Sequence, residues 1–228
     1  MKKKPIFYSE AAYPLALVIM SFAAAFTEKA NFGMSMVVAP AYIIHLKVSE
    51  FLPWFTFGVA EYCFQGVLVV LTALIMRKFK LHYLFSFITA LFYGTLLDMA
   101  MNIIEPLCSD GFAIRTVWYL LGTVLCSLSV SLFFHTYFSP EAYELIVKEI
   151  SVKHGWDINK VKTSYDCIST VIGIILSFSC FGFGVFEGVK LGTVICAFIN
   201  GFLIGKFSRV LENIFVFKNR FNIAKYFS

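Results

Sequence analysis

Charged residues are scarce in this sequence, and that scarcity limits the class of protein. Asp, Glu, Lys and Arg make up 14% of the 228 positions, whereas a soluble domain averages about 25%. Hydrophobic residues make up 59%, and the mean hydropathy is +0.79. A soluble chain of this length has no interior large enough for so much apolar surface. The composition therefore excludes a soluble globular domain and predicts an integral membrane protein.

The sequence also lacks the short motifs of common catalytic and metal sites. It has no HExxH, no nucleophile elbow and no repeated aspartate motif, so we expect no enzyme and no catalytic residues. None of the six cysteines, at positions 63, 108, 126, 167, 180 and 196, has CxxC or metal-ligand spacing. We therefore expect no metal and no cofactor, and we interpret most of these cysteines as small apolar residues of the membrane interior.

Six apolar segments have roughly the 17–25 residues that a helix needs to cross a bilayer. No soluble domain or low-complexity linker interrupts them, so residues 1–228 are expected to form one integral membrane domain with a basic tail at 212–228. The sequence thus predicts an all-α membrane protein with six transmembrane helices. The segments run from Ala11 to Thr27, Trp54 to Met76, Leu81 to Ile104, Thr116 to Phe138, Ser164 to Phe183 and Val189 to Ile204.

Lys and Arg are distributed unequally between the connecting segments. If the N-terminus is cytoplasmic, only Lys29, Lys47, Arg115 and Lys190 of the 19 basic residues fall in outside loops. The positive-inside rule then predicts that both termini are cytoplasmic. The net charge of +5 is explained by this topology and by contact with anionic lipid heads. We therefore expect the lipid bilayer as a partner, and no nucleic acid.

Two halves of the chain, about 11–104 and about 116–211, repeat one order of segments. Each has a long apolar segment, a broken stretch that opens a short helix, and two more long apolar segments. Glu61-Tyr62-Cys63 aligns with Tyr165-Asp166-Cys167, and Tyr93-Gly94-Thr95-Leu96 aligns with Asn200-Gly201-Phe202-Leu203. Three crossings per copy is an odd number, so the second copy would enter the membrane inverted. The pattern predicts two inverted three-helix repeats, which in many transporters place a site where the halves meet.

Each half contains a long connection that predicts a short helix. Ser139-Pro140-Glu141 has the residues of a helix start, an amphipathic pattern follows, and Gly155 ends it. In the first half Ala30-Asn31-Phe32-Gly33 breaks the chain, and Ser35 would cap a helix from Met36 to Leu46. Segments of this length are too short to span, so both are interpreted as re-entrant or interfacial. For the first one, an ordinary outer loop with a surface helix is the alternative.

Ionisable residues within spans are costly in lipid and normally face the interior of a helix bundle. Glu61 and Asp98 lie inside the second and third spans, and Glu28-Lys29 closes the first. We predict that these four residues meet in the outer half of the bundle. The structural alternative is that Lys29 pairs with Glu28 or Glu61 and that Asp98 is hydrogen-bonded near the headgroups.

In the second half, Asp166 begins the fifth span and His135 closes the fourth, both toward the inner side. The alternative for Asp166 is a helix cap near Lys162, and for His135 simple solvation. The helix starts after Gly33 and at Ser139 offer backbone amides for an anionic group, so a zwitterion such as an amino acid would suit. The predicted substrate site comprises Glu28, Lys29, Asn31, Gly33, Glu61, Asp98, His135, Ser139, Asp166 and Asn200.

Several short motifs occur in an order that resembles one family. They are Ala30-Asn31-Phe32-Gly33, Ser139-Pro140, His154-Gly155-Trp156, Val161-Lys162-Thr163 and Val189-Lys190-Leu191-Gly192-Thr193-Val194. This order is similar to that of the YczE/YyaS/YitT family of bacterial integral membrane proteins. Pro40-Ala41-Tyr42 lacks an acid that the family commonly has, and Pro140-Glu141-Ala142 shifts another by one position. The resemblance implies a bacterial inner-membrane protein and suggests transport, without a general substrate.

These observations favour a small-molecule transporter of the bacterial inner membrane that works by alternating access between the inverted repeats. Two alternatives stay open: a substrate-binding subunit of a larger transport complex, and a membrane accessory protein that transports nothing. The expected ligand is an unidentified small molecule, and a homodimer stays open as an assembly.

Overall fold

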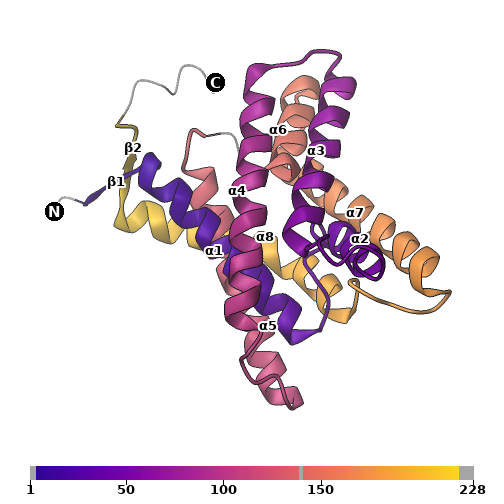
Figure 1. Cartoon of the computed structure of the whole chain (residues 1–228). Coiled ribbons are helices and arrows are strands. Elements are labelled where there is room, and N and C mark those ends of the chain that lie inside the picture. The colour runs from indigo at the N-terminus through magenta and orange to yellow at the C-terminus, as the bar shows by residue number, and fades with distance from the viewer. Residues whose placement is uncertain (1–3, 139–140, 221–228) are drawn as a thin grey trace.

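The computed structural model describes residues 4–138 and 141–220, and within them the chain forms eight α-helices (Figure 1). Six of these helices are long and apolar enough to cross a membrane, and α2 and α6 are short. This confirms the predicted all-α class with six long helices. The helices are α1 Ser9–Ala30, α2 Ala39–Ser49, α3 Phe57–Met76, α4 Leu81–Ile104, α5 Phe112–Phe134, α6 Ala142–His154, α7 Ile158–Phe181 and α8 Leu191–Ile214.

The helix bounds lie within four residues of the predicted ones except at the start of α7, Ile158 rather than Ser164, and at the end of α8. Helix α8 continues past the predicted Ile204 to Ile214. Helix α2 begins at Ala39 rather than Met36, because the Ser35 carbonyl accepts the Val38 and Ala39 N–H groups and forms a turn. Ser35 is therefore not the predicted cap. Gly155 does end α6, in the left-handed conformation with φ 65°.

The two ends of the described chain meet in a small parallel sheet that the sequence pattern did not predict. Strand β1, Ile6–Tyr8, pairs with β2, Val216–Lys218. Between the strands the Phe7 ring lies 5.7 Å from that of Phe217. The start of α1 and the end of α8 therefore lie on the same side of the molecule, called the terminal side below (Figure 1). That this side is cytoplasmic stays a prediction.

Helices α1 and α5 pack side by side at the centre, and their neighbours are arranged reciprocally. Helix α1 packs on α4 as α5 packs on α8, while α2 packs on α7 and α6 packs on α3. Each short helix thus lies against a long helix of the other half. Exchange of the two halves about a two-fold axis would give this pairing. The inverted repeat stays a prediction, and the pairing supports it.

The halves differ in how their last two helices pack. Helices α3 and α4 cross so closely that a methyl group on Gly58 would overlap the Gly94 carbonyl oxygen. In the second half α7 and α8 diverge from their connecting loop (Figure 1). A Cβ on Gly201, which aligns with Gly94, would have no atom of a neighbouring helix within 4 Å. At this crossing the two helices are therefore in close contact in the first half, called closed below, and separated in the second, called open.

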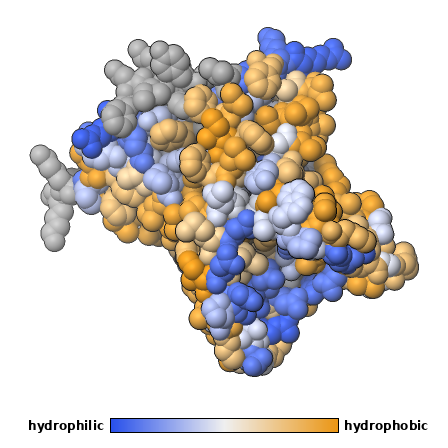
Figure 2. All heavy atoms as spheres, viewed as in Figure 1, coloured by the Kyte–Doolittle hydropathy of each residue, from blue (hydrophilic) through white to orange (hydrophobic). Residues whose placement is uncertain are grey.

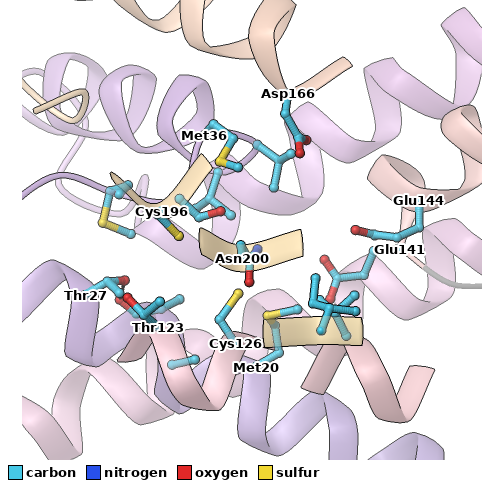
Figure 3. A pocket seen from close by; sticks show the side chains of 18 of the residues that line it. Met20, Thr27, Met36, Thr123, Cys126, Glu141, Glu144, Asp166, Cys196 and Asn200 are labelled. Atoms are coloured by element: carbon cyan, nitrogen blue, oxygen red, sulfur yellow. Dashed lines mark hydrogen bonds between the residues drawn. The ribbon is translucent and has the colours of Figure 1, made fainter. Parts of the chain in front are cut away.

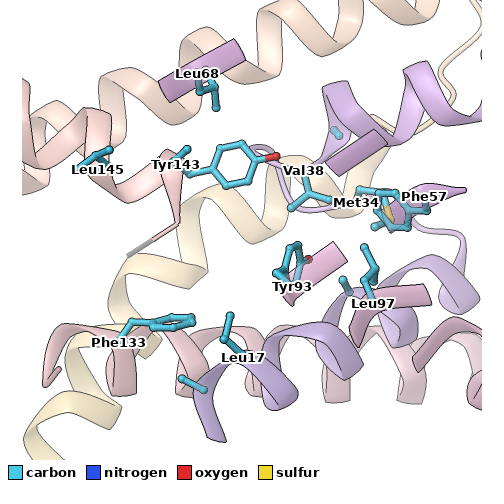
Figure 4. Close-up of a cluster of buried hydrophobic side chains, with 14 of the residues drawn as sticks. Leu17, Met34, Val38, Phe57, Leu68, Tyr93, Leu97, Phe133, Tyr143 and Leu145 are labelled. Atoms are coloured by element: carbon cyan, nitrogen blue, oxygen red, sulfur yellow. The ribbon is translucent and has the colours of Figure 1, made fainter. Parts of the chain in front are cut away.

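The core lies between the central pair and the short helices. Figure 4 shows Tyr93 and Leu97 of α4 between Leu17 on α1 and Val38 at the start of α2. Both α4 side chains are fully buried. On the face shown in Figure 2 hydrophobic residues form most of the surface, and hydrophilic residues gather at the upper right, at the left and in a patch over the lower middle. This distribution is typical of a protein whose flanks contact lipid.

Candidate functional site

An enclosed cavity, called the central cavity below, lies where the two halves meet (Figure 3). Helices α1 and α5 form one wall. The segment Met34–Val38 before α2 and the start of α6 form another, and Tyr93 of α4 and Asn200 of α8 also line it. Tyr93 and Asn200 occupy matching positions of the predicted repeat. Corresponding parts of both halves therefore contribute to the wall.

Charged side chains enter this otherwise apolar cavity from α6 and α7. Figure 3 shows the carboxyl groups of Glu141, Glu144 and Asp166 directed toward its centre. The Lys162 ammonium lies 3.5 Å from Glu144 Oε1 and 3.2 Å from Asp166 Oδ1. Three carboxyl groups thus face one ammonium group. If all are ionised, the lining has an excess of negative charge.

The central cavity is small in this conformation. The space that a water-molecule centre can occupy is about 40 Å³, and one water needs roughly 10–15 Å³ by this measure. The cavity therefore admits a few water molecules or one small ion. A metabolite-sized solute would enter only if the surrounding helices separated.

A network of buried hydrogen bonds stands directly behind Glu141. The Gln65 amide nitrogen on α3 lies 3.3 Å from Glu61 Oε2 and 3.3 Å from Glu141 Oε2. Its amide oxygen accepts the Ala142 N–H at 3.2 Å, so the amide is fixed in this orientation. The Tyr143 hydroxyl donates to Glu61 Oε2 at 2.9 Å. Helices α3 and α6, from opposite halves, are thus joined through these two carboxyl groups.

Some polar atoms around the cavity have no hydrogen-bond partner among the described residues. They are Glu141 Oε1, Glu61 Oε1 and the Tyr93 hydroxyl. Glu61 and Tyr93 are fully buried, and Glu141 is 3% exposed. Burial, together with the nearby carboxyl groups of Glu144 and Glu61, raises the pKa of Glu141 well above its usual range. Polar groups this deeply buried normally have partners, so these atoms indicate a place for a ligand, a proton or water.

A second hollow, the polar cleft, opens on the side opposite the termini and has a volume of about 970 Å³. The predicted residues Glu28, Lys29 and Asn31 all line it. The Tyr42 hydroxyl donates to Glu28 at 3.3 Å. Thr27, the residue before Glu28, lines the central cavity. The cleft therefore approaches the cavity at the end of α1.

The predicted meeting of Glu28, Lys29, Glu61 and Asp98 does not occur. Asp98 accepts hydrogen bonds from the Thr56 hydroxyl at 2.6 Å and the Gly58 N–H at 2.8 Å. Free N–H groups at a helix start attract a carboxylate, and Asp98 therefore caps α3. Glu61 instead faces α6. The prediction was wrong because it used depth along each helix and could not include the direction of each side chain.

The remaining predicted residues fall into three places. Asp166 and Asn200 line the central cavity, where Ser127 donates to the Asn200 side chain at 2.7 Å. His135 lies on the terminal side, 3.2 Å from Glu212 Oε1, and forms no part of the cavity. Gly33 has φ 105° and packs against the start of α8. Ser139 lies outside the described residues.

The cavity also contains groups that the sequence analysis did not select. Lys162 and Asp166 are four positions apart, as are Glu61 and Gln65, so each pair shares a helix face. That spacing was a usable signal. Glu144 belongs to the polar face of an amphipathic helix, a face that usually meets water. Here α6 packs inside the protein, so the same face meets the cavity.

Six long apolar helices around an enclosed charged cavity define an α-helical, multi-pass membrane protein. The chain belongs to a family of unknown function, DUF6198, whose model matches residues 7–209. No curated protein and no solved structure matches the chain.

Proposed function

We propose that the protein is a membrane transporter for a small, singly charged cation, and that it works by alternating access between its two halves. The observation that carries this proposal is the central cavity, an enclosed space between the halves with three carboxyl groups against one ammonium group. Charged groups within membrane spans commonly mark a solute or ion pathway. A cavity at the interface between halves is also where transporters with inverted repeats bind their solutes.

The charge of the lining favours a cation over the zwitterion expected from the sequence. That expectation relied on two helix starts as sites for an anionic group. At the start of α6, the Ala142 N–H is bonded to Gln65, and Glu141 already places an acid there. At the start of α2, the Val38 and Ala39 N–H groups are bonded to Ser35. Lys162 is engaged by two acids, so among the described residues that line the central cavity no cationic group is left for a solute carboxylate.

The arrangement of the acids favours a singly charged ion over a divalent metal. Divalent ions such as Ca²⁺ take six to eight oxygen ligands, several of them carboxylates. In residues 4–138 and 141–220, no three His, Cys, Asp or Glu side chains converge closely enough to hold a metal ion. A monovalent or ammonium-type cation, which keeps water or makes hydrogen bonds, suits the separated acids better.

Alternating access is supported by the difference between the halves. The α3–α4 crossing is closed at Gly58 and Gly94, and the matching α7–α8 crossing is open. In an inverted repeat, exchange of these two arrangements would close the α7–α8 crossing and open the α3–α4 crossing, on the other side of the cavity. The solute would then enter from one side of the membrane and leave on the other.

Uptake into proteoliposomes tests the proposal. We expect radiolabelled sodium, rubidium or tetramethylammonium ions to accumulate in vesicles that contain the wild-type protein. Glycine and glutamate should not accumulate. Asp166→Asn should reduce cation uptake about tenfold or more, because one charged contact of a ligand is worth roughly 1.5–3 kcal/mol.

The matched control is Asp110→Asn, because Asp110 lies in the exposed loop between α4 and α5. This variant should transport cations like the wild type. Uptake of the acidic or zwitterionic solute in place of the cations would overturn the assignment of the substrate class. Absence of uptake for all five solutes by folded protein would overturn transport.

The alternative of a binding subunit in a larger complex receives no support from the described residues. It would be favoured by an exposed small-residue face on the first helices. The alanines of α1 are instead largely buried against α5, and Gly122 of α5 lies directly against Ala23 and Thr27. A bacterial inner-membrane location, the absence of enzyme activity and the resemblance to YczE/YyaS/YitT proteins stay predictions.

A further inference from the structure

Glu61 and Glu141 are two fully enclosed carboxyl groups with an unusual set of partners. Glu61 lies on α3 and Glu141 directly precedes α6, and the single Gln65 amide group contacts both at 3.3 Å. Within the described chain, no Lys, Arg or His forms an ion pair with either of them. The Lys162 ammonium, which lines the same cavity as Glu141, is already bound by Glu144 and Asp166.

Two negative charges in this position would be strongly unfavourable. The effective cost of moving an ion from water into a protein interior is several kcal/mol unless a counter-charge compensates it. Adjacent carboxylates add repulsion, so one of two such groups normally holds a proton. Each carboxyl group also has one oxygen, Oε1, without a hydrogen-bond partner among the described residues. A protonated carboxyl group can use such an oxygen as a hydroxyl donor.

The position of the pair connects it to the central cavity. Glu141 lines the cavity, and Glu61 lies behind it, joined through Gln65. The fully buried Tyr93, whose hydroxyl is unpartnered, lines the same wall. A proton that leaves Glu141 therefore reaches the space that a cation would occupy.

We infer that Glu61 and Glu141 together hold one exchangeable proton, and that the transported cation displaces this proton from the central cavity. The inference rests on the proposed function for the identity of the competing ion. One positive charge enters as one leaves, so the net charge of the site is unchanged. The protein would thus exchange a monovalent cation for a proton across the membrane.

The groups around Glu61 and Glu141 indicate that this pair is the site that gains or loses a proton. The titratable groups that face the pair or line the same cavity are Tyr13, Tyr93, Cys126, Tyr143, Glu144, Lys162 and Asp166. Tyrosine and cysteine are ordinarily neutral near pH 7. Glu144 and Asp166 both form ion pairs with Lys162, whereas neither Glu61 nor Glu141 forms one within the described chain. A proton gained or lost near neutral pH is therefore assigned to Glu61 and Glu141.

Infrared spectroscopy of the purified protein in detergent tests the proton site directly. We expect a carbonyl band of a protonated carboxylic acid to persist at neutral pH and to decrease when sodium, rubidium or tetramethylammonium chloride is added. Glu61→Gln and Glu141→Gln should each abolish the cation-dependent decrease. Glu212→Gln, which changes an exposed carboxylate on the terminal side, should leave it unaltered. A wild-type spectrum without this band would overturn the inference, whether or not the variants fold.

Proteoliposomes that contain a pH-sensitive dye separate this inference from the proposed function. The three probe cations are not weak bases, so they carry no protons themselves. In wild-type vesicles, cation uptake should move protons out of the lumen, and the apparent affinity should fall about tenfold per pH unit on acidification. Cation uptake without proton movement would overturn the coupling and leave the proposed function standing. A cation-sensitive carboxyl band in protein that moves no cation would retain the proton site and overturn the proposed transport.

Discussion

Gly58 and Gly94 allow α3 and α4 to approach until their backbones touch. At Gly58 a methyl group would meet the Gly94 carbonyl and the Asp98 carboxylate that caps α3. A backbone carbonyl cannot turn away as a flexible side chain can. We therefore expect Gly58→Ala to destabilise the protein by about 1–3 kcal/mol, the usual cost of overpacking. Thermal unfolding in detergent measures this as a lower Tm.

Gly201→Ala is the control for this change. Gly201 on α8 aligns with Gly94 on α4, the glycine that contacts Gly58. Unlike Gly94, Gly201 has open space where a Cβ would lie. Alanine favours a helix over glycine by up to about 1 kcal/mol, so Gly201→Ala should leave Tm unchanged or raise it. Equal Tm values for Gly58→Ala and Gly201→Ala would refute the asymmetric packing.

Single residues also show what the sequence could predict about the site. The depth of Glu61 within a span was evident, because an unpaired acid among apolar residues is conspicuous. Its partner, Glu141, was not predictable as such. Glu141 follows a proline and precedes a helix, where an acid ordinarily complements the helix dipole. Only the packing of α6 against α3 brings the two carboxyl groups to one amide.

One acidic side chain, Glu149, attaches α6 to the start of α4. Glu149 on α6 accepts hydrogen bonds from Lys80 Nζ at 2.8 Å and the Tyr83 hydroxyl at 2.9 Å, and His82 Nε2 lies 3.1 Å away. Its partners lie at the start of α4 and just before it. Burial alone would raise the pKa of Glu149, but the bonds from Lys80 and Tyr83 outweigh burial and lower it.

We expect Glu149→Gln to loosen α6, with a loss of about 1–2 kcal/mol, because hydrogen bonds to a charged group are replaced by weaker ones. The sign of the pH effect follows from the lowered pKa. Glu149 stabilises the fold above its unfolded pKa, about 4.3, and this contribution is lost as pH falls through the lower folded value. The wild-type Tm should therefore fall in acid more steeply than that of Glu149→Gln.

The control for α6 is Glu50→Gln, because Glu50 pairs with Lys47 at the surface of α2 at 2.7 Å. Exposed ion pairs contribute about 0–1 kcal/mol, so this variant should unfold like the wild type at every pH. If the Tm values of Glu50→Gln and Glu149→Gln change with pH in the same way, the hydrogen bonds of Glu149 do not stabilise the fold.

At this scale the sequence predicted which elements exist better than how they meet. Long apolar runs identify six spans, since the bilayer sets their length, and Gly155 marks the end of α6 because its positive φ suits glycine. The pairing of β1 with β2 joins segments at opposite ends of the chain. Three-residue strands carry no periodic signal that could reveal such a partner.

For the whole molecule, the reciprocal packing of the halves leads to a prediction about motion. Positions Val67 on α3 and Phe92 on α4 are exposed, and their counterparts in the repeat alignment are Val171 on α7 and Ile199 on α8, also exposed. In a cysteine-free background, spin labels at each pair report the two crossings. We expect sodium, rubidium or tetramethylammonium ions together with a pH gradient to lengthen the distance between the labels on α3 and α4 and to shorten the distance between the labels on α7 and α8.

The two labelled pairs serve as controls for each other. Uniform loosening of the protein would lengthen both distances, and a rigid protein would change neither. Either result, measured by pulsed electron resonance in proteoliposomes, would contradict an exchange of arrangements between the halves.

The pairing of β1 with β2 has a consequence for biogenesis. Residues 6–8 precede all six long helices in the chain, and their partners, residues 216–218, follow all of them. Strand β1 therefore has no partner strand until all six spans have been synthesised. This sheet can close only after the last of the six helices has been synthesised, so it cannot help the earlier helices to assemble.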